Sequence, residues 1–208
     1  TRAQRAIDDG LNQKEIAPVT IRTRRGEHTV SVDEQPHKAN LEKIPQLRPA
    51  FAENGTITPA NSSSISDGAS ALLLASEAAV EAHGLTARAR IVAHSRNSLA
   101  PEAFTLAPIG AAEDVLAKAG WTVADVDLWE INEAFAMVTM LTVDALKLDP
   151  ACVNVHGGAC AQGHPIGSTG SRIIVTLMHA LEHYGKKRGV AALCIGGGEA
   201  TAVAIELV

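Results

Sequence analysis

Aromatic residues are scarce in this sequence, which contains two Trp, one Tyr and three Phe among its 208 residues. A hydrophobic core must therefore be built mainly from Ala, Val, Leu and Ile. Because 46% of the residues are nevertheless apolar and only 20% are charged, the composition excludes an intrinsically disordered chain.

Cysteine is also rare, and the three cysteines are an odd number: Cys152, Cys160 and Cys194. This argues against a secreted disulfide scaffold and predicts a reducing, cytoplasmic location. No apolar run reaches the roughly 18 residues of a membrane span, so no membrane partner is expected. A net charge of −5 without a basic block argues against a nucleic-acid partner. The polar start, which has no initiator Met, resembles the middle of a longer protein.

Residues 1–60 are predicted to be irregular. A short helix over residues 1–10 and a hairpin of Val19–Thr23 with His28–Val32 are expected. Four prolines between residues 36 and 59 exclude one long helix there. The basic residues gathered in this part form either a solvated face or a lid that touches an anionic ligand.

From Asn61 onward, helical and strand patterns alternate. The expected helices cover residues 67–82, 108–120, 132–148 and 168–184, and the expected strands cover residues 89–94, 126–131, 152–155, 190–195 and 201–208. This order predicts an α/β layer with a five-stranded, mainly parallel sheet covered by helices. The last two strands are joined by only a few residues, so this pair is expected to be antiparallel.

The segment INEAFA places Asn132 and Glu133 where a predicted strand passes into a helix. Ligands of α/β sheets bind outside the carboxyl ends of strands, which makes this a predicted edge of a site. The alternative is that Asn132 only caps the helix.

The segment HGGACAQGHPIGSTGSR, residues 156–172, contains five glycines and leads into a helix. His164 lies between Gly163 and Pro165 in a rigid turn, which favours a functional imidazole. His156, Cys160 and His164 are spaced four apart, as zinc ligands on one helix would be. The glycines and the proline make such a continuous helix implausible, so no metal is expected.

The segment CIGGGEA ends a predicted buried strand with Cys194 followed by three glycines. Amide groups of such a glycine turn can form an oxyanion hole. Cys194 is either a general base or a small buried hydrophobic residue; Cys152 and Cys160 are interpreted as the latter. A histidine, a cysteine, an asparagine and glycine amides together suit enolate and thioester chemistry.

These three segments, in this order and spacing, resemble the C-terminal motifs of the thiolases, and most closely those of the acetyl-CoA C-acetyltransferases. NSSSISDGASALLL at residues 61–74 and LRPAF at residues 47–51 resemble two further segments of the family. The resemblance implies a thiolase-type layered α/β fold. It implies the C-terminal part of an irregular α+β loop domain at residues 1–60 and the C-terminal thiolase domain at residues 61–208.

The resemblance also implies roles for individual residues. His164 matches the histidine that activates the nucleophilic cysteine and helps to hold the thioester oxygen, and Cys194 matches the base that takes the α-proton of acetyl-CoA. Asn132 matches the residue that positions a water of the oxyanion hole, and Gly196 matches the backbone donor of a second oxyanion hole. The implied contacts with coenzyme A are Ser63, Ala134, Phe135 and Leu47.

Some features depart from the family pattern. The motif of the nucleophilic cysteine is absent, so we expect an N-terminal thiolase half as a partner and an inactive chain in isolation. Pro36 stands where relatives have an arginine that contacts coenzyme A; Lys38 or Lys43 is a candidate replacement. Ser64 stands where a glycine is more usual.

The expected reaction is the condensation of two acetyl-CoA molecules to acetoacetyl-CoA, or its reverse, with coenzyme A as substrate and product and no other cofactor. A homodimer or homotetramer is implied for the complete enzyme. Two alternatives remain: a 3-ketoacyl-CoA thiolase of β-oxidation, and a non-catalytic subunit that binds acyl-CoA.

Overall fold

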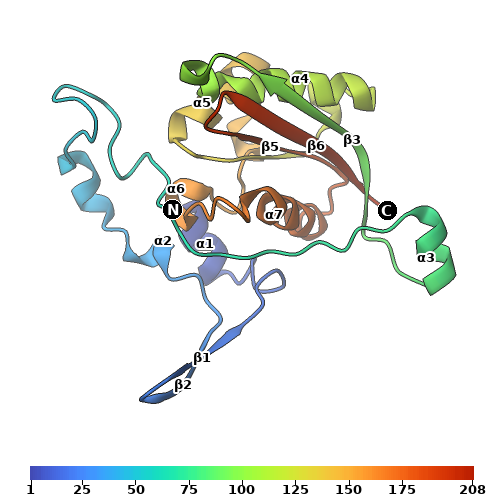
Figure 1. Cartoon of the computed structure of the whole chain (residues 1–208), viewed down its shortest axis with the longest axis horizontal. Helices are drawn as coiled ribbons and strands as arrows, with labels where there is room; N and C mark the ends of the chain where they lie inside the picture. Colours follow the sequence, from blue (N-terminus) through green and yellow to red (C-terminus); the bar gives the residue numbers. More distant parts are fainter.

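A four-stranded mixed sheet forms the centre of the molecule, and the computed structural model describes all residues from 1 to 208 (Figure 1). Its strands lie in the order β3-β6-β5-β4. They comprise β3 (Ala89–Ser98), β6 (Glu199–Leu207), β5 (Arg188–Cys194) and β4 (Leu128–Ile131). Only β4 and β5 pair in parallel, whereas β6 pairs antiparallel with both β5 and β3.

Helices cover both faces of this sheet (Figure 1). Helix α4 (Ala107–Ala119) and helix α5 (Ala136–Leu146) lie on one side, and α7 (Thr169–His183) lies on the other. The α4 side holds the larger core, in which Ala, Val, Leu and Ile side chains surround the buried Trp129. The α7 side holds a smaller core that includes Leu128, Ile173 and Leu177. Aliphatic packing therefore replaces the missing aromatic residues, as the composition predicts.

Short elements connect these layers. They are α3 (Glu77–His83), η2 (Pro101–Leu106), η3 (Val123–Asp125), η4 (Pro150–Cys152) and α6 (Ala159–Gln162). None of the helices is both long and apolar enough to cross a membrane.

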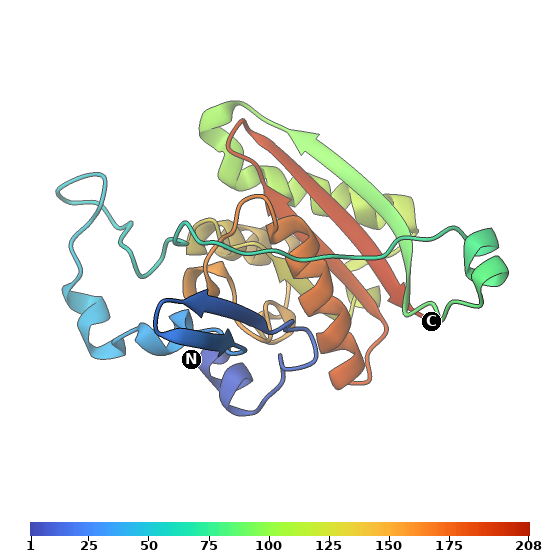
Figure 2. The same cartoon turned by 60° about the horizontal axis from the view of Figure 1, so that its bottom comes forward.

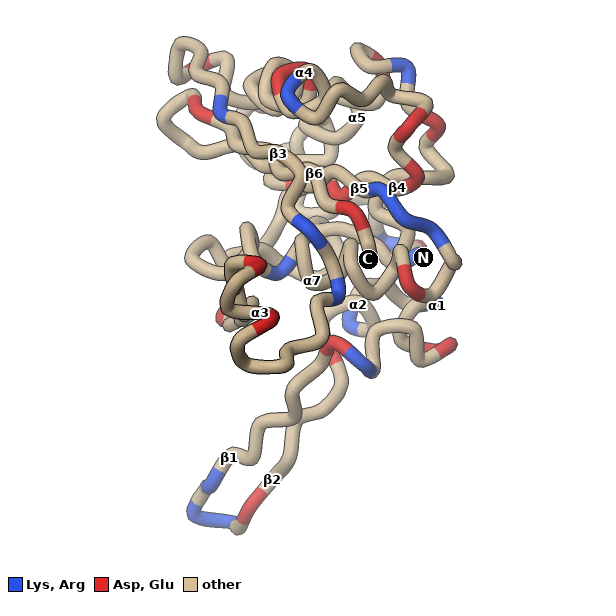
Figure 3. Tube along the Cα trace, turned by 90° about the vertical axis from the view of Figure 1, so that its right-hand side faces the viewer, with Lys and Arg blue, Asp and Glu red and all other residues tan.

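The first 60 residues consist of small elements; the first of these packs on the rest of the molecule through the buried Ala3 and Ala6, and those after it extend away from the sheet (Figure 1). These elements are α1 (Arg2–Asp8), β1 (Val19–Thr23), β2 (Gly26–Val30), α2 (Gln35–Lys38) and η1 (Leu41–Gln46). The β1–β2 hairpin projects into solvent with basic residues at its tip (Figure 3). The predicted first helix and hairpin are confirmed, except that the second strand is Gly26–Val30 rather than His28–Val32.

The predicted helix over residues 67–82 is wrong for most of its length. Only α3 is helical, and the hydroxyl of Ser76 begins it by accepting a hydrogen bond from the Ala79 N–H at 3.2 Å. Residues 67–76 run extended across α7 instead (Figure 2). The Ser70 hydroxyl holds this path through hydrogen bonds of 2.7 and 2.6 Å to the hydroxyls of Ser168 and Ser171.

The prediction of a mixed α/β sheet covered by helices is confirmed, but its details differ. The sheet is mainly antiparallel rather than mainly parallel. The predicted fifth strand, residues 152–155, is reduced to one parallel bridge between Val153 and Trp129. Asn154 has a φ of 48°, which is incompatible with a continuing strand and ends the pairing there.

Candidate active site

Two neighbouring parallel strands, β4 and β5, end next to each other and place two of the predicted residues there. Asn132 directly follows β4, and its backbone N–H donates to the carbonyl of Ala192 on β5 at 2.9 Å. Cys194 is the last residue of β5, two positions beyond Ala192. The strand register therefore brings Asn132 and Cys194 to the same edge of the sheet, as the sequence predicts.

Asn132 is almost completely buried, and neither atom of its side-chain amide has a hydrogen-bond partner within the protein. It does not cap the following helix, because α5 begins at Ala136 and its N-cap is Phe135. Buried amides without partners cost free energy unless a ligand or an ordered water satisfies them. The Asn132 side chain is therefore available to hold a water or a substrate atom.

A network of hydrogen bonds fixes the backbone on both sides of Asn132. The side-chain amide of Asn154 accepts from the Ile131 N–H and donates to the Ile131 carbonyl, both at 2.8 Å. It also donates to the Glu133 carboxylate at 3.3 Å. This carboxylate accepts in turn from the N–H of Cys160 at 3.1 Å, which ties the glycine-rich loop to the end of β4.

His164 lies in the glycine-rich loop and is linked to the end of β4 through residues 62–65, because Ser62 bridges to Phe135 and Ile65 bridges to His164. The His164 N–H donates to the Ser64 carbonyl at 2.9 Å, and its ring Nδ1 lies 2.6 Å from the Thr169 hydroxyl. Ring Nε2 has no hydrogen-bond partner in the protein. Burial, reinforced by the positive charge of Arg172, lowers the pKa of His164. The imidazole is therefore neutral at pH 7 and able to accept a proton.

Cys194 is 7% exposed, and its burial raises the pKa of the thiol. The turn that follows is closed by hydrogen bonds from Ile195 N–H to the Glu199 carbonyl at 2.7 Å and from Gly198 N–H to the Ile195 carbonyl at 3.1 Å. The N–H of Gly196 makes no hydrogen bond within the protein. Gly196 is exposed, and a Cβ built on it would meet no atom within 4 Å, so the space beside this residue is open.

Three of the predicted coenzyme A contacts lie together. The N–H and the hydroxyl of Ser63 donate to the Ala134 carbonyl at 3.1 and 3.0 Å. The next residue, Phe135, packs edge-on against Phe51 and Phe104, with ring centroids 6.4 and 6.3 Å away. All three phenylalanines of the chain thus border one cavity of about 350 Å³.

The fourth predicted contact, Leu47, lies apart from this cluster. It follows η1 on the exposed N-terminal part, where its backbone N–H donates to the Ile44 carbonyl. Lys38 makes an ion pair with Glu34 at 2.6 Å, which is one turn earlier in the chain. The contacts of Leu47 and Lys38 with coenzyme A therefore remain predictions.

Cys160 and His156, the other two candidates of the glycine-rich segment, lie in surroundings that suppress their reactivity. Burial and the Glu133 charge raise the pKa of Cys160 to about 12, so its thiol stays protonated. His156 is buried among the rings of His183 and Tyr184, at centroid distances of 6.2 and 5.7 Å, and burial lowers its pKa to about 4. No group of three or more potential metal ligands exists.

The sequence reasoning missed Thr169, Asn154 and Phe104. A signal existed for Asn154, since it lies near the end of the predicted strand 152–155, just before the glycine-rich loop. Thr169 is five residues beyond His164, and the turn between them is not predictable from spacing. Phe104 reaches Phe135 only through the tertiary fold.

Comparison with protein-family models finds two matches in this chain. The model of the thiolase C-terminal domain matches residues 85–207, and that of the thiolase N-terminal domain matches residues 1–78. The prediction that only the C-terminal portion is present is therefore not confirmed. The chain spans about half the length of the curated relatives that it matches.

Among these relatives, the mouse protein "Acetyl-CoA acetyltransferase, cytosolic" is 47% identical over 208 residues, which cover 99% of this chain and 52% of the mouse protein. The bovine "3-ketoacyl-CoA thiolase, mitochondrial" is 43% identical over 206 residues, or 99% of this chain and 52% of the relative. Both activities named in the sequence analysis thus occur among the relatives.

Solved structures share the fold. The Bacillus anthracis acetyl-CoA acetyltransferase superposes with a TM-score of 0.96 at 41% identity, covering 100% of this chain and 53% of that one. The Acat5 thiolase from Ascaris suum, solved in complex with coenzyme A, gives a TM-score of 0.88 at 38% identity, with coverage of 100% and 53%.

Proposed function

Since this chain belongs to the thiolase family, we propose that it supplies the proton-transfer and oxyanion groups of an acetyl-CoA acetyltransferase. The complete enzyme condenses two acetyl-CoA molecules to acetoacetyl-CoA and coenzyme A, and it catalyses the reverse thiolysis. The observation that carries this proposal is the unsatisfied, buried amide of Asn132 beside the strand that ends at Cys194.

In the condensation, a nucleophilic cysteine gives its proton to His164 Nε2 and takes the acetyl group of a first acetyl-CoA as a thioester. Coenzyme A leaves as a thiol by taking the proton of Cys194, which becomes a thiolate. The Cys194 thiolate removes the α-proton of a second acetyl-CoA, and the negative charge moves to the thioester oxygen. His164 and a water on the Asn132 amide stabilise this oxygen. The enolate carbon attacks the thioester on the nucleophile, whose sulfur leaves as thiolate, while the Gly196 N–H holds the oxygen of the tetrahedral intermediate.

The acid–base properties of the site support these roles. The raised pKa of Cys194 makes its thiolate a stronger base and lets its thiol donate a proton in thiolysis. The lowered pKa of His164 keeps its lone pair available at neutral pH. Proton transfer in both directions thus relies on two groups whose pKa values shift in opposite directions.

The acyl-CoA ligand is proposed to pass the cluster of Ser63, Ala134 and Phe135. The aromatic rings of Phe51, Phe104 and Phe135 provide an apolar wall for the uncharged part of such a ligand. Coenzyme A is substrate and product, and the proposed chemistry uses no other cofactor.

The nucleophilic cysteine is proposed to lie outside these 208 residues, in an N-terminal half on the same or another chain. The thiol of Cys160 is protonated and donates a hydrogen bond to the Glu133 carbonyl, and Cys152 packs at the edge of the α7-side core. Cys194 is assigned to proton transfer. On this proposal the chain alone has no thiolase activity.

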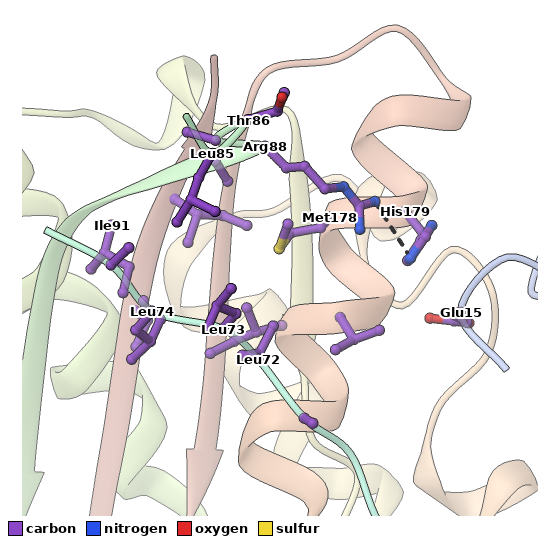
Figure 4. Close-up of a pocket in the computed structure, with 18 of the residues that line it drawn as sticks. Glu15, Leu72, Leu73, Leu74, Leu85, Thr86, Arg88, Ile91, Met178 and His179 are labelled. Atoms are coloured by element: carbon purple, nitrogen blue, oxygen red, sulfur yellow. Dashed lines mark hydrogen bonds between the residues drawn. The ribbon is translucent and has the colours of Figure 1, made fainter. Parts of the chain in front are cut away.

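The extended segment over residues 67–76 supports a missing partner surface. The backbone groups of residues 67–75 make no hydrogen bond with another backbone group. The side chains in this segment are also exposed, Leu73 to 86% and Leu74 to 71%. These leucines border a groove of about 750 Å³ beside α7, with Ile91 and Met178 on its other walls (Figure 4). An extended segment with unpaired backbone groups and apolar side chains is suited to pair with the edge of another sheet. The N-terminal family model ends at residue 78, just after this segment.

A 3-ketoacyl-CoA thiolase is the second candidate, because the bovine relative with this name is 43% identical. A cytosolic location is proposed because the mouse relative is named cytosolic. A homodimer or homotetramer is proposed for the complete enzyme on family grounds.

Two assays test the proposal. Thiolysis of acetoacetyl-CoA is measured for this chain alone and for the complete protein isolated from its source, with intact-mass analysis of both. We expect activity only in the complete protein, and thiolysis by the chain alone would refute the external nucleophile. Comparing acetoacetyl-CoA with a long-chain 3-ketoacyl-CoA then separates the two candidate activities.

A further inference from the structure

The contact between His164 and Thr169 determines which ring nitrogen of the histidine carries a proton. A neutral imidazole has one N–H nitrogen and one lone-pair nitrogen, and the partner of one nitrogen sets the role of the other. Nδ1 lies 2.6 Å from the Thr169 hydroxyl, whereas Nε2 has no partner in the protein. The Thr169 side chain is therefore the one group that can select the tautomer.

The Thr169 hydroxyl has a second neighbour. Its oxygen lies 3.0 Å from the carbonyl oxygen of Pro165, four residues earlier, and the hydroxyl donates to this carbonyl. Threonines in the first turn of a helix commonly donate to the carbonyl four residues before them. Because a hydroxyl has a single proton, the same oxygen is left to accept from Nδ1–H of His164.

We propose that Thr169 is the positioning residue of His164, whose hydroxyl holds Nδ1 in its protonated form and so leaves the lone pair on Nε2. The hydrogen-bond chain runs from His164 Nδ1–H through the Thr169 hydroxyl to the Pro165 carbonyl. When Nε2 accepts a proton from a thiol, Nδ1 keeps its proton and its acceptor. No atom of Thr169 needs to move during this step.

A hydroxyl differs from the carboxylate that orients many catalytic histidines, because it carries no charge. It therefore orients the ring and raises the proton affinity of the imidazole less than a carboxylate would. Thr169 is fully buried, so solvent does not compete for its hydroxyl. Among the charged groups, Arg172 acts on His164 in the opposite sense to a carboxylate and favours the neutral ring.

The inference rests on the proposed function for the role of Nε2, but its test does not require turnover. The probe is the ¹⁵N spectrum of the ring nitrogens in the histidine-labelled 208-residue chain at pH 7, with a His164→Asn variant to identify the signals. We expect wild-type His164 to show a protonated Nδ1 and a lone pair on Nε2. A protonated Nε2 in the wild type would overturn the proposal, since the hydroxyl would then donate to Nδ1.

Two substitutions separate positioning from packing. Thr169→Val keeps the shape of the side chain and removes the hydroxyl, whereas Thr169→Ser keeps the hydroxyl and removes a methyl group. We expect the valine variant to lose the single tautomer and to titrate His164 at a lower pH, because the cationic ring has lost its acceptor. The serine variant should retain the wild-type tautomer and titration. An unchanged tautomer in the valine variant would contradict the proposal.

In the complete enzyme, we expect Thr169→Val to lower kcat about 10- to 100-fold with little change in KM, since a well-placed general base contributes roughly 10²–10⁴ in rate. The serine variant should restore most of this loss. If the tautomer is as proposed but the enzyme does not act on acyl-CoA, the positioning role stands and the proposed function fails.

Discussion

The side chain of Asn154 takes the place of a neighbouring strand beside Ile131. Its amide makes two hydrogen bonds of 2.8 Å with the N–H and the carbonyl of that residue, at the last position of β4 before Asn132. The single bridge between Val153 and Trp129 precedes this contact. Backbone pairing with β4 ends at Asn154, and the side-chain amide of this residue supplies the next two hydrogen bonds. These bonds fix the backbone of Ile131, the residue before Asn132.

Replacing Asn154 should destabilise the fold and disturb the site. Asn154→Ala leaves the buried N–H of Ile131 without a partner, whereas the Ile131 carbonyl keeps the Thr139 hydroxyl at 3.1 Å. The expected cost is about 1–3 kcal/mol in the free energy of unfolding. Asn154→Gly removes the same amide but tolerates the φ of 48°, so it should lose less stability than the alanine variant. Urea unfolding of the two variants measures both effects. Equal stability of both variants and the wild type would show that the amide does not support β4.

The close approach of Gly158 to Glu133 gives a second prediction. A Cβ at Gly158 would lie 2.3 Å from the carboxyl carbon of Glu133, whereas one at Gly167 would meet nothing within 4 Å. Gly158→Ala should therefore displace the Glu133 carboxylate and cost about 1–3 kcal/mol, while Gly167→Ala should be nearly neutral. Thermal unfolding of the matched pair measures the difference. Indistinguishable melting temperatures would contradict the described loop packing.

Glu130 predicts a specific dependence of stability on pH. Burial raises the pKa of this carboxyl to about 8, and one of its oxygens has no hydrogen-bond partner. Between about pH 4.5, where the unfolded group ionises, and pH 8, the folded state binds more protons than the unfolded state. The contribution of Glu130 to stability therefore falls as the pH rises through this window.

Glu130→Gln removes this titration. We expect the stability of the variant relative to the wild type to increase between pH 5 and pH 8, as measured by urea unfolding at several pH values. Comparing the two proteins cancels the titration of the other groups, including His156. A stability difference that is constant across this range would show that Glu130 is ionised in the folded state.

The sequence correctly places Asn132 and Cys194 at the ends of strands, whereas it mispredicts the arrangement of the strands. Asn132, His164 and Cys194 stand at the ends of periodic segments or between glycine and proline, where local rules apply. The path of residues 67–76 is not predictable in this way, because the run around Leu72 and Leu73 has the apolar content of a helix. Its extended form depends on contacts of Ser70 with residues about 100 positions later.

The hydroxyl–imidazole contact at Thr169 and the aromatic contact at Phe104 escape prediction for the same reason. Both are tertiary contacts whose partners are set by the turn at Pro165 and by the packing of η2 on α5. Motif spacing fixes the order of such residues along the chain, but it does not fix the distance between their atoms.

The central claim is that Cys194 transfers the α-proton of acetyl-CoA, and solvent deuterium exchange at this carbon tests it most directly. In the complete enzyme, Cys194→Ala should reduce the exchange rate by at least about 100-fold, the lower range for general-base catalysis, without a matching loss of affinity for acetyl-CoA. Cys152→Ala, which removes a different and only partly buried thiol, is the control; this variant should catalyse deuterium exchange at the wild-type rate. Exchange at the wild-type rate in Cys194→Ala would contradict the account.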